Sequence, residues 1–152
     1  MRAVVQRVEN AHVTIDGAVK GAIEAGFVVF LGIGRDDSEA EIERLWSKIF
    51  KLRIFADGDK PTGATLSDIG GNVLIISQFT LYADCRKGNR PSFGLAGEPV
   101  ESERLYHAFV ERARADLPGV QTGEFGADMQ VSLVNDGPFT ICLDTDDLAR
   151  PR

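Results

Sequence analysis

The pattern of apolar and polar residues in the first part of the chain predicts short strands joined by turns. β-Branched and apolar residues alternate or cluster over residues 3–8 and 11–15, on both sides of Glu9 and Asn10. Two such runs separated by two polar residues favour a hairpin, so we expect one at the start of the chain. The Asp-Gly dipeptide at residues 16–17 predicts a second turn.

A buried strand and a helix are predicted next. Residues 19–23 have the composition of a short strand, and residues 27–33 form an unbroken apolar run, which is typical of a strand buried on both faces. Ser38 and Glu41 have the spacing of a capping box, which marks the start of a helix. We expect this helix to run to Leu52 and to bury one apolar face, formed by Ile42, Leu45, Trp46 and Ile49.

The middle of the chain combines a long loop with the strongest strand signal. Residues 57–72 are rich in Gly, Asp and Thr, so we expect a loop there. Residues 73–83 read V-L-I-I-S-Q-F-T-L-Y-A and predict a long apolar strand that contains Ser77, Gln78 and Thr80. Polar side chains are costly to bury unless they are paired, so these three residues need a reason for being there.

The last part of the chain predicts a second helix at residues 102–116 and strands at residues 120–125, 129–134 and 139–144. The last two strands flank residues 135–140, which read N-D-G-P-F-T. Asp-Gly is a strong hairpin signal, whereas a proline after it cannot donate a hydrogen bond to a sheet. The stretch therefore predicts a turn, with the proline at the start of the final strand.

Strands interrupted by two helices and short turns predict the α+β class, with a mainly antiparallel sheet that curls into a barrel and two inserted helices. At 152 residues, the chain is expected to form a single domain over residues 1–145. Residues 146–152 are expected to be a frayed C-terminal tail. No strand is followed by a glycine-rich loop and a helix, which argues against a nucleotide-binding α/β fold.

The charge of the chain is acidic, with one basic exception. Lys and Arg number 17 and Asp and Glu number 23, which gives a net charge of −6. Proteins that bind nucleic acid through their overall field are basic, so any contact with RNA has to be local. Arg86, Lys87 and Arg90 form a basic loop that provides such a contact. The alternative is a solvated loop without a partner.

The two cysteines, Cys85 and Cys142, lie far apart in strand-like runs. We interpret both as small buried residues, and free thiols fit a reducing cytosol better than a disulfide framework. The first residues include Arg2 and Arg7 and lack a long apolar core, which does not fit a signal peptide. The longest apolar run, residues 27–33, is too short to cross a bilayer, so we expect a cytoplasmic protein with no membrane partner.

Conventional catalytic sets are nearly absent from the sequence. The two histidines, His12 and His107, do not have metal-ligand spacing with cysteines or carboxylates, so no metal and no other cofactor is expected. Thr80 is a candidate nucleophile, but no general base is evident for it. Cys85 lies beside two basic residues, which can activate a thiol. Alternatively, main-chain N–H groups of residues 78–80 hold a developing oxyanion.

Five stretches of the sequence carry a resemblance to a known family. Two of them are short motifs, at residues 77–80 and 135–140, and each alone is weak evidence. Both motifs at this separation, with the other three stretches in the same order along the chain, make a specific signal. The stretches are S-Q-F-T at residues 77–80, N-D-G-P-F-T at 135–140, M-R-A-V-V-Q-R-V at 1–8, R-K-G-N-R-P-S-F at 86–93 and F-G-A-D-M at 125–129. Together they resemble the D-aminoacyl-tRNA deacylase family, also called the D-tyrosyl-tRNA deacylase family, over residues 1–144.

This resemblance implies a homodimer in which each active site is completed across the interface. Gly137 and Pro138 of one subunit, joined by a cis peptide bond, enter the site of the other subunit. Their carbonyl groups receive the amino group of the substrate and leave no room for an L side chain. The substrate is an amino acid esterified to the terminal adenosine of tRNA, and the reaction is hydrolysis of that ester. The catalytic segment consists of Ser77, Gln78, Phe79 and Thr80.

Further roles follow from the same resemblance. Phe125 and Met129 are implied to line the pocket, and Arg7 to fix the Gly-Pro segment. The basic loop is implied to meet the acceptor end of the tRNA. The 2′-OH of the terminal ribose is implied to assist the chemistry, which would explain why no protein base is found. Achiral glycine would pass the same filter, so glycyl-tRNA is a second expected substrate.

The sequence departs from the family pattern at two places. Phe139 stands where the family commonly has a smaller valine, and residues 62–65 read T-G-A-T where M-N-x-S is frequent. Two rival hypotheses also stay open. In one, the enzyme uses Thr80 or Cys85 as a covalent nucleophile. In the other, the chain is a non-catalytic module that binds the tRNA acceptor end.

Overall fold

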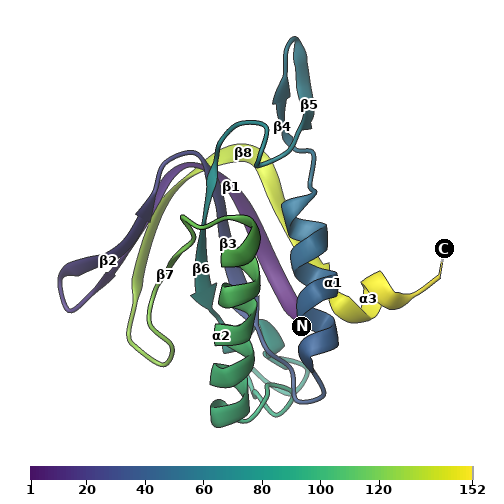
Figure 1. The fold of residues 1–152 in the computed structure, drawn as a ribbon. Coiled ribbons are helices and arrows are strands. Elements are labelled where there is room, and N and C mark those ends of the chain that lie inside the picture. The colour runs from purple at the N-terminus through teal and green to yellow at the C-terminus, as the bar shows by residue number, and fades with distance from the viewer. Residues whose placement is uncertain (152) are drawn as a thin grey trace.

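The structure, a computed structural model, describes residues 1–151. Its strands are β1 (Arg2–Ile15), β2 (Ala18–Ile23), β3 (Gly26–Gly32), β4 (Phe55–Asp57), β5 (Lys60–Ala64), β6 (Asn72–Ser77), β7 (Gln121–Thr122) and β8 (Gln130–Asp144). Its helices are α1 (Glu39–Phe50), the 3₁₀-helix η1 (Phe79–Tyr82), α2 (Pro99–Asp116) and α3 (Thr145–Ala149). Figure 1 shows α1 and α2 side by side on one face of the main sheet.

The main sheet is mixed and nearly closed, which confirms the predicted α+β class with a barrel-like sheet. Its order is β2-β1-β3-β6-β7, with β8 also paired to β1. β1 is antiparallel to β2, β3 and β8, whereas the pairs β3–β6 and β6–β7 are parallel. β2 approaches β7 at the far edge, where a Cβ added to Gly21 would lie 2.7 Å from the carbonyl oxygen of Thr122. The sheet thus curls back on itself (Figure 1).

Both faces of the central strands are buried, as the apolar run at residues 27–33 predicts. One face packs against the helices, where Phe27, Trp46 and Phe109 are fully buried. The other face packs against the second half of β1, with Val13 and Val28 fully buried there. The helices thereby fix one side of the sheet while β1 and β8 fold over the other.

Helix α1 has the predicted cap and the predicted buried face. The Ser38 side chain accepts a hydrogen bond from the N–H of Ala40, and the Ser38 N–H donates to Glu41 at 2.8 Å. The indole N–H of Trp46 donates to Asp116 of α2 at 2.9 Å, which ties the two helices together. Helix α2 begins earlier than residue 102, because a proline suits the first turn of a helix and Pro99 occupies it.

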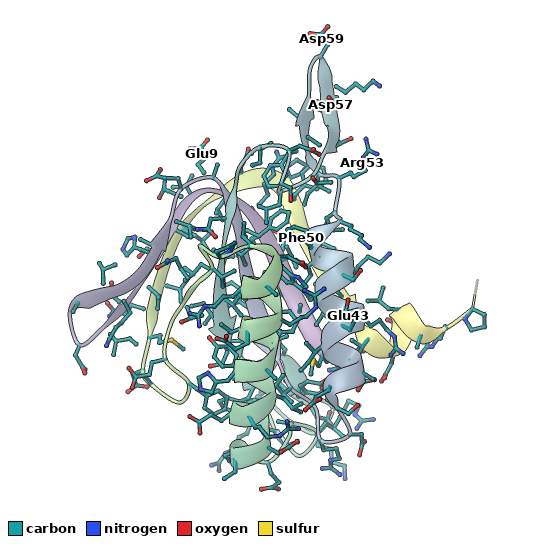
Figure 2. All side chains as sticks on the ribbon, in the orientation of Figure 1. Glu9, Glu43, Phe50, Arg53, Asp57 and Asp59 are labelled. Carbon is teal, nitrogen blue, oxygen red and sulfur yellow. The ribbon has the colours of Figure 1, made fainter. Side chains whose placement is uncertain are left out.

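The expected hairpin at the start of the chain is wrong. Residues 2–15 form one bent strand, and Glu9 lies at the bend, exposed to solvent (Figure 2). The register with β8 passes from Val8 to Asn10, so Glu9 is an extra residue of β1 without a partner on β8. A bulge bends a strand without reversing it, and here it lets β1 pair with β3 before the bend and with β2 after it.

The expected turn at residues 135–140 is also wrong. The segments 129–134 and 139–144 belong to the single strand β8, which stays paired to β1 on both sides of the N-D-G-P-F-T stretch. The Asn135 side chain donates hydrogen bonds to the carbonyl oxygens of Arg7 and Phe139, at 2.8 and 3.2 Å. This side chain bridges the irregular part of the strand and keeps it in the sheet.

Three further expectations need correction. The strand at residues 73–83 ends at Ser77, because the chain turns into η1 there. The loop at residues 57–72 contains part of a hairpin, β4–β5, which projects from the body with Asp57 and Asp59 near its end (Figure 2). The strand at residues 120–125 is reduced to β7.

Both cysteines are exposed, so their interpretation as buried residues is wrong. Cys85 lies after η1, outside any strand, and Cys142 lies on the outer face of β8. At the C-terminal end, α3 gives helical structure to part of the expected tail, and the buried Thr145 bonds through its N–H to the carbonyl oxygen of Met1 at 2.9 Å. The division of the chain at residue 145 stays a prediction. Among residues 1–151, no helix is long and apolar enough to span a membrane.

Candidate active site

A largely apolar cavity of about 240 Å³ opens where β3 and β6 end and α2 begins. Its polar lining comes from Ser77, Gln78 and Ser102. Its apolar lining comes from the end of β3, the segment before α2 and the segment after β7, and includes Leu31, Ile33, Ala96, Pro99 and Phe125. Three of the four predicted catalytic residues, Ser77, Gln78 and Phe79, therefore share one cavity with the predicted pocket residue Phe125.

The segment after β6 leaves two main-chain N–H groups without a partner. The Gln78 N–H donates to the carbonyl oxygen of Leu31 at 2.7 Å, and the first bond of η1 runs from Leu81 to Gln78 at 3.2 Å. Within residues 1–151, the N–H groups of Phe79 and Thr80 donate to no protein acceptor, and no side chain caps η1. These N–H groups are thus free to bind an oxyanion beside the cavity.

The polar side chains of this segment are not buried, contrary to the expectation of a buried polar cluster. Ser77 and Gln78 are half-buried at the cavity wall, and Thr80 is exposed. The Gln78 amide donates a hydrogen bond to the Thr80 hydroxyl. Ser77 and Gln78 are therefore placed to contact a molecule in the cavity, whereas Thr80 lies outside its lining.

Sequence reasoning missed the wall formed by residues 96–102. The Gly97 N–H donates to the carbonyl oxygen of Ile33 at 3.0 Å, and a Cβ added to Gly97 would lie 2.6 Å from the Ser102 hydroxyl and 3.0 Å from the Gly34 carbonyl oxygen. Any side chain at this position would displace Ser102 and crowd the backbone of Gly34, so glycine allows the close approach. The Gly-Glu-Pro sequence before α2 was the available signal, because glycine and proline mark a fixed chain path at a helix start.

The predicted chiral-selection segment lies in a large bulge of β8. Between the pairs Gln6–Thr140 and Val8–Asn135, a single residue of β1 stands opposite four residues of β8, residues 136–139. The peptide bond between Gly137 and Pro138, the second and third residues of the bulge, is cis. Since the flanking pairs stay in the sheet, the four residues must project from the ladder.

Arg7 is the single residue opposite this bulge, and it is nearly buried, at 9% exposure. Its guanidinium donates to the carbonyl oxygens of Asp136 and Gly137, each at 3.1 Å, and to that of Ile54. It also forms an ion pair with the Asp136 carboxylate at 2.8 Å and lies 4.6 Å from the centre of the Phe139 ring. Arg7 therefore contacts three of the four residues of the bulge, Asp136, Gly137 and Phe139.

The tip of the bulge faces open space. Gly137 and Pro138 are exposed, and a Cβ added to Gly137 would meet no atom within 4 Å. The φ angle of Gly137 is not in the left-handed region. Contacts within the chain therefore do not require glycine at this position. Among the described residues, Arg7, Gly137 and Pro138 do not line the cavity.

Met129 lies away from the cavity, whereas Phe125 is anchored beside it. The Met129 side chain packs against Gly123 and the smaller part of the core. The Phe125 ring lies 5.8 Å from the ring of Tyr106, whose hydroxyl donates to the carbonyl oxygen of Ile75 at 2.9 Å. Burial raises the pKa of Tyr106 to about 12, so its phenol stays protonated and acts as a support for Phe125.

The basic loop is exposed and closed at its base. Two hydrogen bonds between Asp84 and Ser92, at 2.8 and 3.0 Å, bring its ends together. Arg86 forms an ion pair with Asp84 at 2.6 Å, and its hydrogen bonds lower the pKa of that carboxyl to about 2. Within residues 1–151, Lys87 and Arg90 have no ion-pair partner, so their charges are available to a ligand.

Within residues 1–151, no histidine, cysteine or carboxylate lines the cavity. His107 lies on the exposed face of α2, 3.8 Å from Glu103, and neither it nor His12 lines the cavity. Cys85 is exposed and does not line it either. In the part of the chain that the structure describes, no cluster of His, Cys, Asp and Glu is suited to a metal ion.

With this geometry in view, the relationships of the chain are clear. Residues 4–144 match the sequence model of the family described as D-Tyr-tRNA(Tyr) deacylase. The chain belongs to this family. It is 56% identical over 146 residues to a D-aminoacyl-tRNA deacylase of Lacticaseibacillus casei (strain BL23), with 96% of this chain and 99% of the relative covered. It is 55% identical over 147 residues to a D-aminoacyl-tRNA deacylase of Ruegeria sp. (strain TM1040), covering 97% of this chain and 94% of the relative.

Solved structures show the same fold. A structure titled c-Myc DNA Unwinding Element Binding Protein has a TM-score of 0.89 at 41% identity, covering 95% of this chain and 98% of that one. A structure titled as a probable eukaryotic D-amino acid tRNA deacylase has a TM-score of 0.82 at 15% identity, covering 93% and 97% of the two chains. The architecture is therefore retained where most of the sequence differs.

Proposed function

We propose that this protein is a D-aminoacyl-tRNA deacylase, which hydrolyses the ester bond between a D-amino acid and the terminal adenosine of tRNA. The observation that carries the proposal is the sequence identity of 56% and 55%, over nearly the full length of the chain, to two D-aminoacyl-tRNA deacylases. The free N–H groups of Phe79 and Thr80 at an apolar cavity supply a chemical means for it.

The reaction uses the main chain rather than a catalytic side chain. Water attacks the ester carbonyl carbon, and the carbonyl oxygen becomes an oxyanion that accepts hydrogen bonds from the N–H groups of Phe79 and Thr80. Each such donor is worth on the order of a hundredfold in rate. The bond between the carbonyl carbon and the ribose oxygen then breaks, and that oxygen takes up a proton. The ribose 2′-OH assists the proton transfers, so no protein base is required. Ser77 and Gln78 orient the ester.

The site is completed by a second copy of the chain. Gly137 and Pro138 project from their own subunit and reach the cavity of a partner, so that the protein acts as a homodimer. The open space around Gly137 supports this, because nothing in its own subunit excludes a side chain there. A glycine lets a backbone approach another surface closely.

Chiral selection follows from the carbonyl groups of this segment. The Gly137 oxygen already accepts one hydrogen bond from Arg7, and a carbonyl oxygen has a second lone pair for the substrate amino group. With the amino group held there, an L side chain would collide with the backbone of the partner, whereas a D side chain points away. Glycine has no side chain to exclude, so glycyl-tRNA is also a substrate.

Within this proposal Phe125 supports the amino-acid end of the substrate, and Met129 acts only indirectly, through the segment at Gly123 against which it packs. Arg86, Lys87 and Arg90 contact the phosphates of the acceptor end. The exposed, uncompensated charges of Lys87 and Arg90 support that role in an acidic chain. Phosphate contacts give a salt-sensitive component to binding.

The test is hydrolysis of D-tyrosyl-tRNA and L-tyrosyl-tRNA by the purified protein. We expect release of tyrosine from the D-ester well above the rate in buffer, and no acceleration for the L-ester. Equal cleavage of both esters, or cleavage of neither, would overturn the proposal. Salt-sensitive tRNA binding without cleavage would favour the non-catalytic binding module instead.

Two variants separate the main-chain mechanism from a covalent one. Thr80→Val and Cys85→Ala each remove a possible nucleophile while leaving the main-chain N–H groups in place. A covalent mechanism predicts near-total loss of the single-turnover rate with one of them, whereas the main-chain mechanism predicts partial loss or none.

A further inference from the structure

A second, open hollow adjoins the cavity and shares part of its wall. Phe79, Ala96 and Gly97 line both, and Arg35 and Phe93 line only the open hollow. A molecule that enters the cavity from solvent therefore has a continuous surface on which its outer part can rest. The side chain of Phe79 is 57% exposed on this surface.

The exposed ring belongs to an ordered aromatic pair. The rings of Phe79 and Phe93 lie 4.9 Å apart at 69°, an edge-to-face arrangement. Phe93 directly follows the Asp84–Ser92 closure of the basic loop, and its carbonyl oxygen accepts a hydrogen bond from the Ala96 N–H at 2.9 Å. The pair is thus held by the fold while leaving aromatic surface open to solvent.

Positive charge borders this pair at Arg35, and one acidic residue, Glu98, lines the same hollow. The Arg35 N–H donates to the carbonyl oxygen of Leu95 at 3.2 Å, which fixes the residue beside the hollow. Within residues 1–151 its guanidinium has no ion-pair partner and lies close to Gly94. Lys87 and Arg90 lie in the loop that leads into Phe93. The exposed ring of Phe79 and the half-buried ring of Phe93, combined with uncompensated cations, suit single-stranded nucleic acid, since bases stack on rings and phosphates pair with cations.

We propose that Phe79, Phe93 and Arg35, here called the aromatic platform, bind the unpaired nucleotide that precedes the terminal adenosine of the substrate. The inference rests on the proposed function, which places the esterified adenosine at the cavity. The polynucleotide must then leave across the shared wall, where its next base stacks on the rings and its phosphate meets Arg35. Stacking tolerates any base, which suits an enzyme that acts on many tRNAs.

The test compares a substrate that has this nucleotide with one that lacks it. Phe93→Leu removes an aromatic face outside the reacting segment and keeps an apolar side chain. We expect it to lower kcat/KM for D-tyrosyl-tRNA by roughly tenfold, mainly through KM, and to leave cleavage of the D-tyrosyl ester of adenosine alone unchanged. Arg35→Gln should act in the same way, and Phe93→Tyr should restore the wild-type value.

A binding measurement keeps the inference separate from the proposed function. Uncharged tRNA is titrated in two forms, one with an intact 3′ end and one without its last two nucleotides. The platform predicts that Phe93→Leu weakens binding of the intact form only, even if the wild type cleaves no ester. Equal loss on tRNA and on the adenosine ester would overturn the inference, because Phe93 would then act only by supporting Phe79. A changed sedimentation coefficient of the variant would also overturn the inference, because this surface would then belong to an interface with a second copy of the chain. Unchanged kinetics and unchanged tRNA binding of the variant would overturn it as well.

Discussion

At the scale of single residues, Gly137 gives the sharpest separation between folding and activity. Its subunit leaves the position open, with no atom within 4 Å of an added Cβ. We expect Gly137→Ala to change the free energy of unfolding by less than about 0.5 kcal/mol. Hydrolysis of D-tyrosyl-tRNA should fall on the order of tenfold or more, because in the proposed dimer the methyl group would displace the substrate in the partner's cavity. Urea unfolding and single-turnover hydrolysis measure the two effects.

The matched control is Gly97→Ala, where the added Cβ would meet the Ser102 hydroxyl at 2.6 Å and the Gly34 carbonyl oxygen at 3.0 Å within the same subunit. That variant should lose about 1–3 kcal/mol of stability, as overpacked sites do. Full activity of Gly137→Ala would contradict the role assigned to the bulge.

Phe139, which departs from the family pattern, makes a cation–π contact in this structure. Its ring lies 4.6 Å from the guanidinium of Arg7, which is nearly buried and holds two carbonyl groups of the bulge. Phe139→Leu keeps an apolar side chain but removes the π-face, so we expect the free energy of unfolding to fall by about 1 kcal/mol. Urea unfolding tests this, with Phe139→Tyr as the control that keeps the ring. A leucine variant as stable as the wild type would show that the contact contributes nothing.

At the scale of elements, two sequence patterns typical of turns correspond to bulges within continuous strands, and the chain does not reverse direction there. Glu9 and Asn10 in β1, and residues 135–140 in β8, have the local composition of turns, yet both strands continue through them. The reason is a long-range one, since β1 and β8 pair with each other on both sides of the irregular points. Sequence periodicity reports which residues alternate along a strand, but it does not report which distant strand supplies the partner.

Elements with strong local signals were predicted well. The capping box at Ser38 and the apolar face after it fixed α1, and the unbroken apolar run fixed β3 as a strand buried on both faces. For the site, the family motifs pointed to residues 77–80 and to Gly137, but not to the wall around Gly97 or to the exposure of the cysteines. Those features depend on how the segment before α2 packs back on β3, which no local pattern encodes.

The cap of α1 makes a pH-dependent contribution to stability. The hydrogen bond from the Ser38 side chain lowers the pKa of Glu41 below its ordinary value of 4.5. A carboxyl with a lowered pKa in the folded state stabilises the protein above its unfolded pKa, and this stabilisation is lost as the pH falls through the folded pKa. Ser38→Ala should therefore cost about 1 kcal/mol near pH 7 and less near pH 3. Urea unfolding at both values, with Ser47→Ala on the same helix as control, measures it. An equal cost at both values would contradict the linkage.

At the scale of the whole molecule, the two parts of the proposed site belong to different regions of the subunit. The cavity lies where β3, β6 and α2 meet, whereas the bulge projects from β8 opposite Arg7. A single subunit does not bring Gly137 or Pro138 to the lining of its own cavity within the described residues. The proposed active site thus requires a symmetric dimer in which each copy supplies the bulge for the other.

The most direct test mixes two defective subunits. Ser77→Phe fills the cavity but keeps the bulge, and Gly137→Ala alters the bulge but keeps the cavity. When equal amounts are unfolded and refolded together, about half of the dimers contain one subunit of each kind, and each of these has one intact site. Hydrolysis of D-tyrosyl-tRNA should then recover to about a quarter of the wild-type rate, although each variant alone keeps only about a tenth of that rate or less. A mixture no more active than the separate variants would contradict a site shared between two copies of the chain.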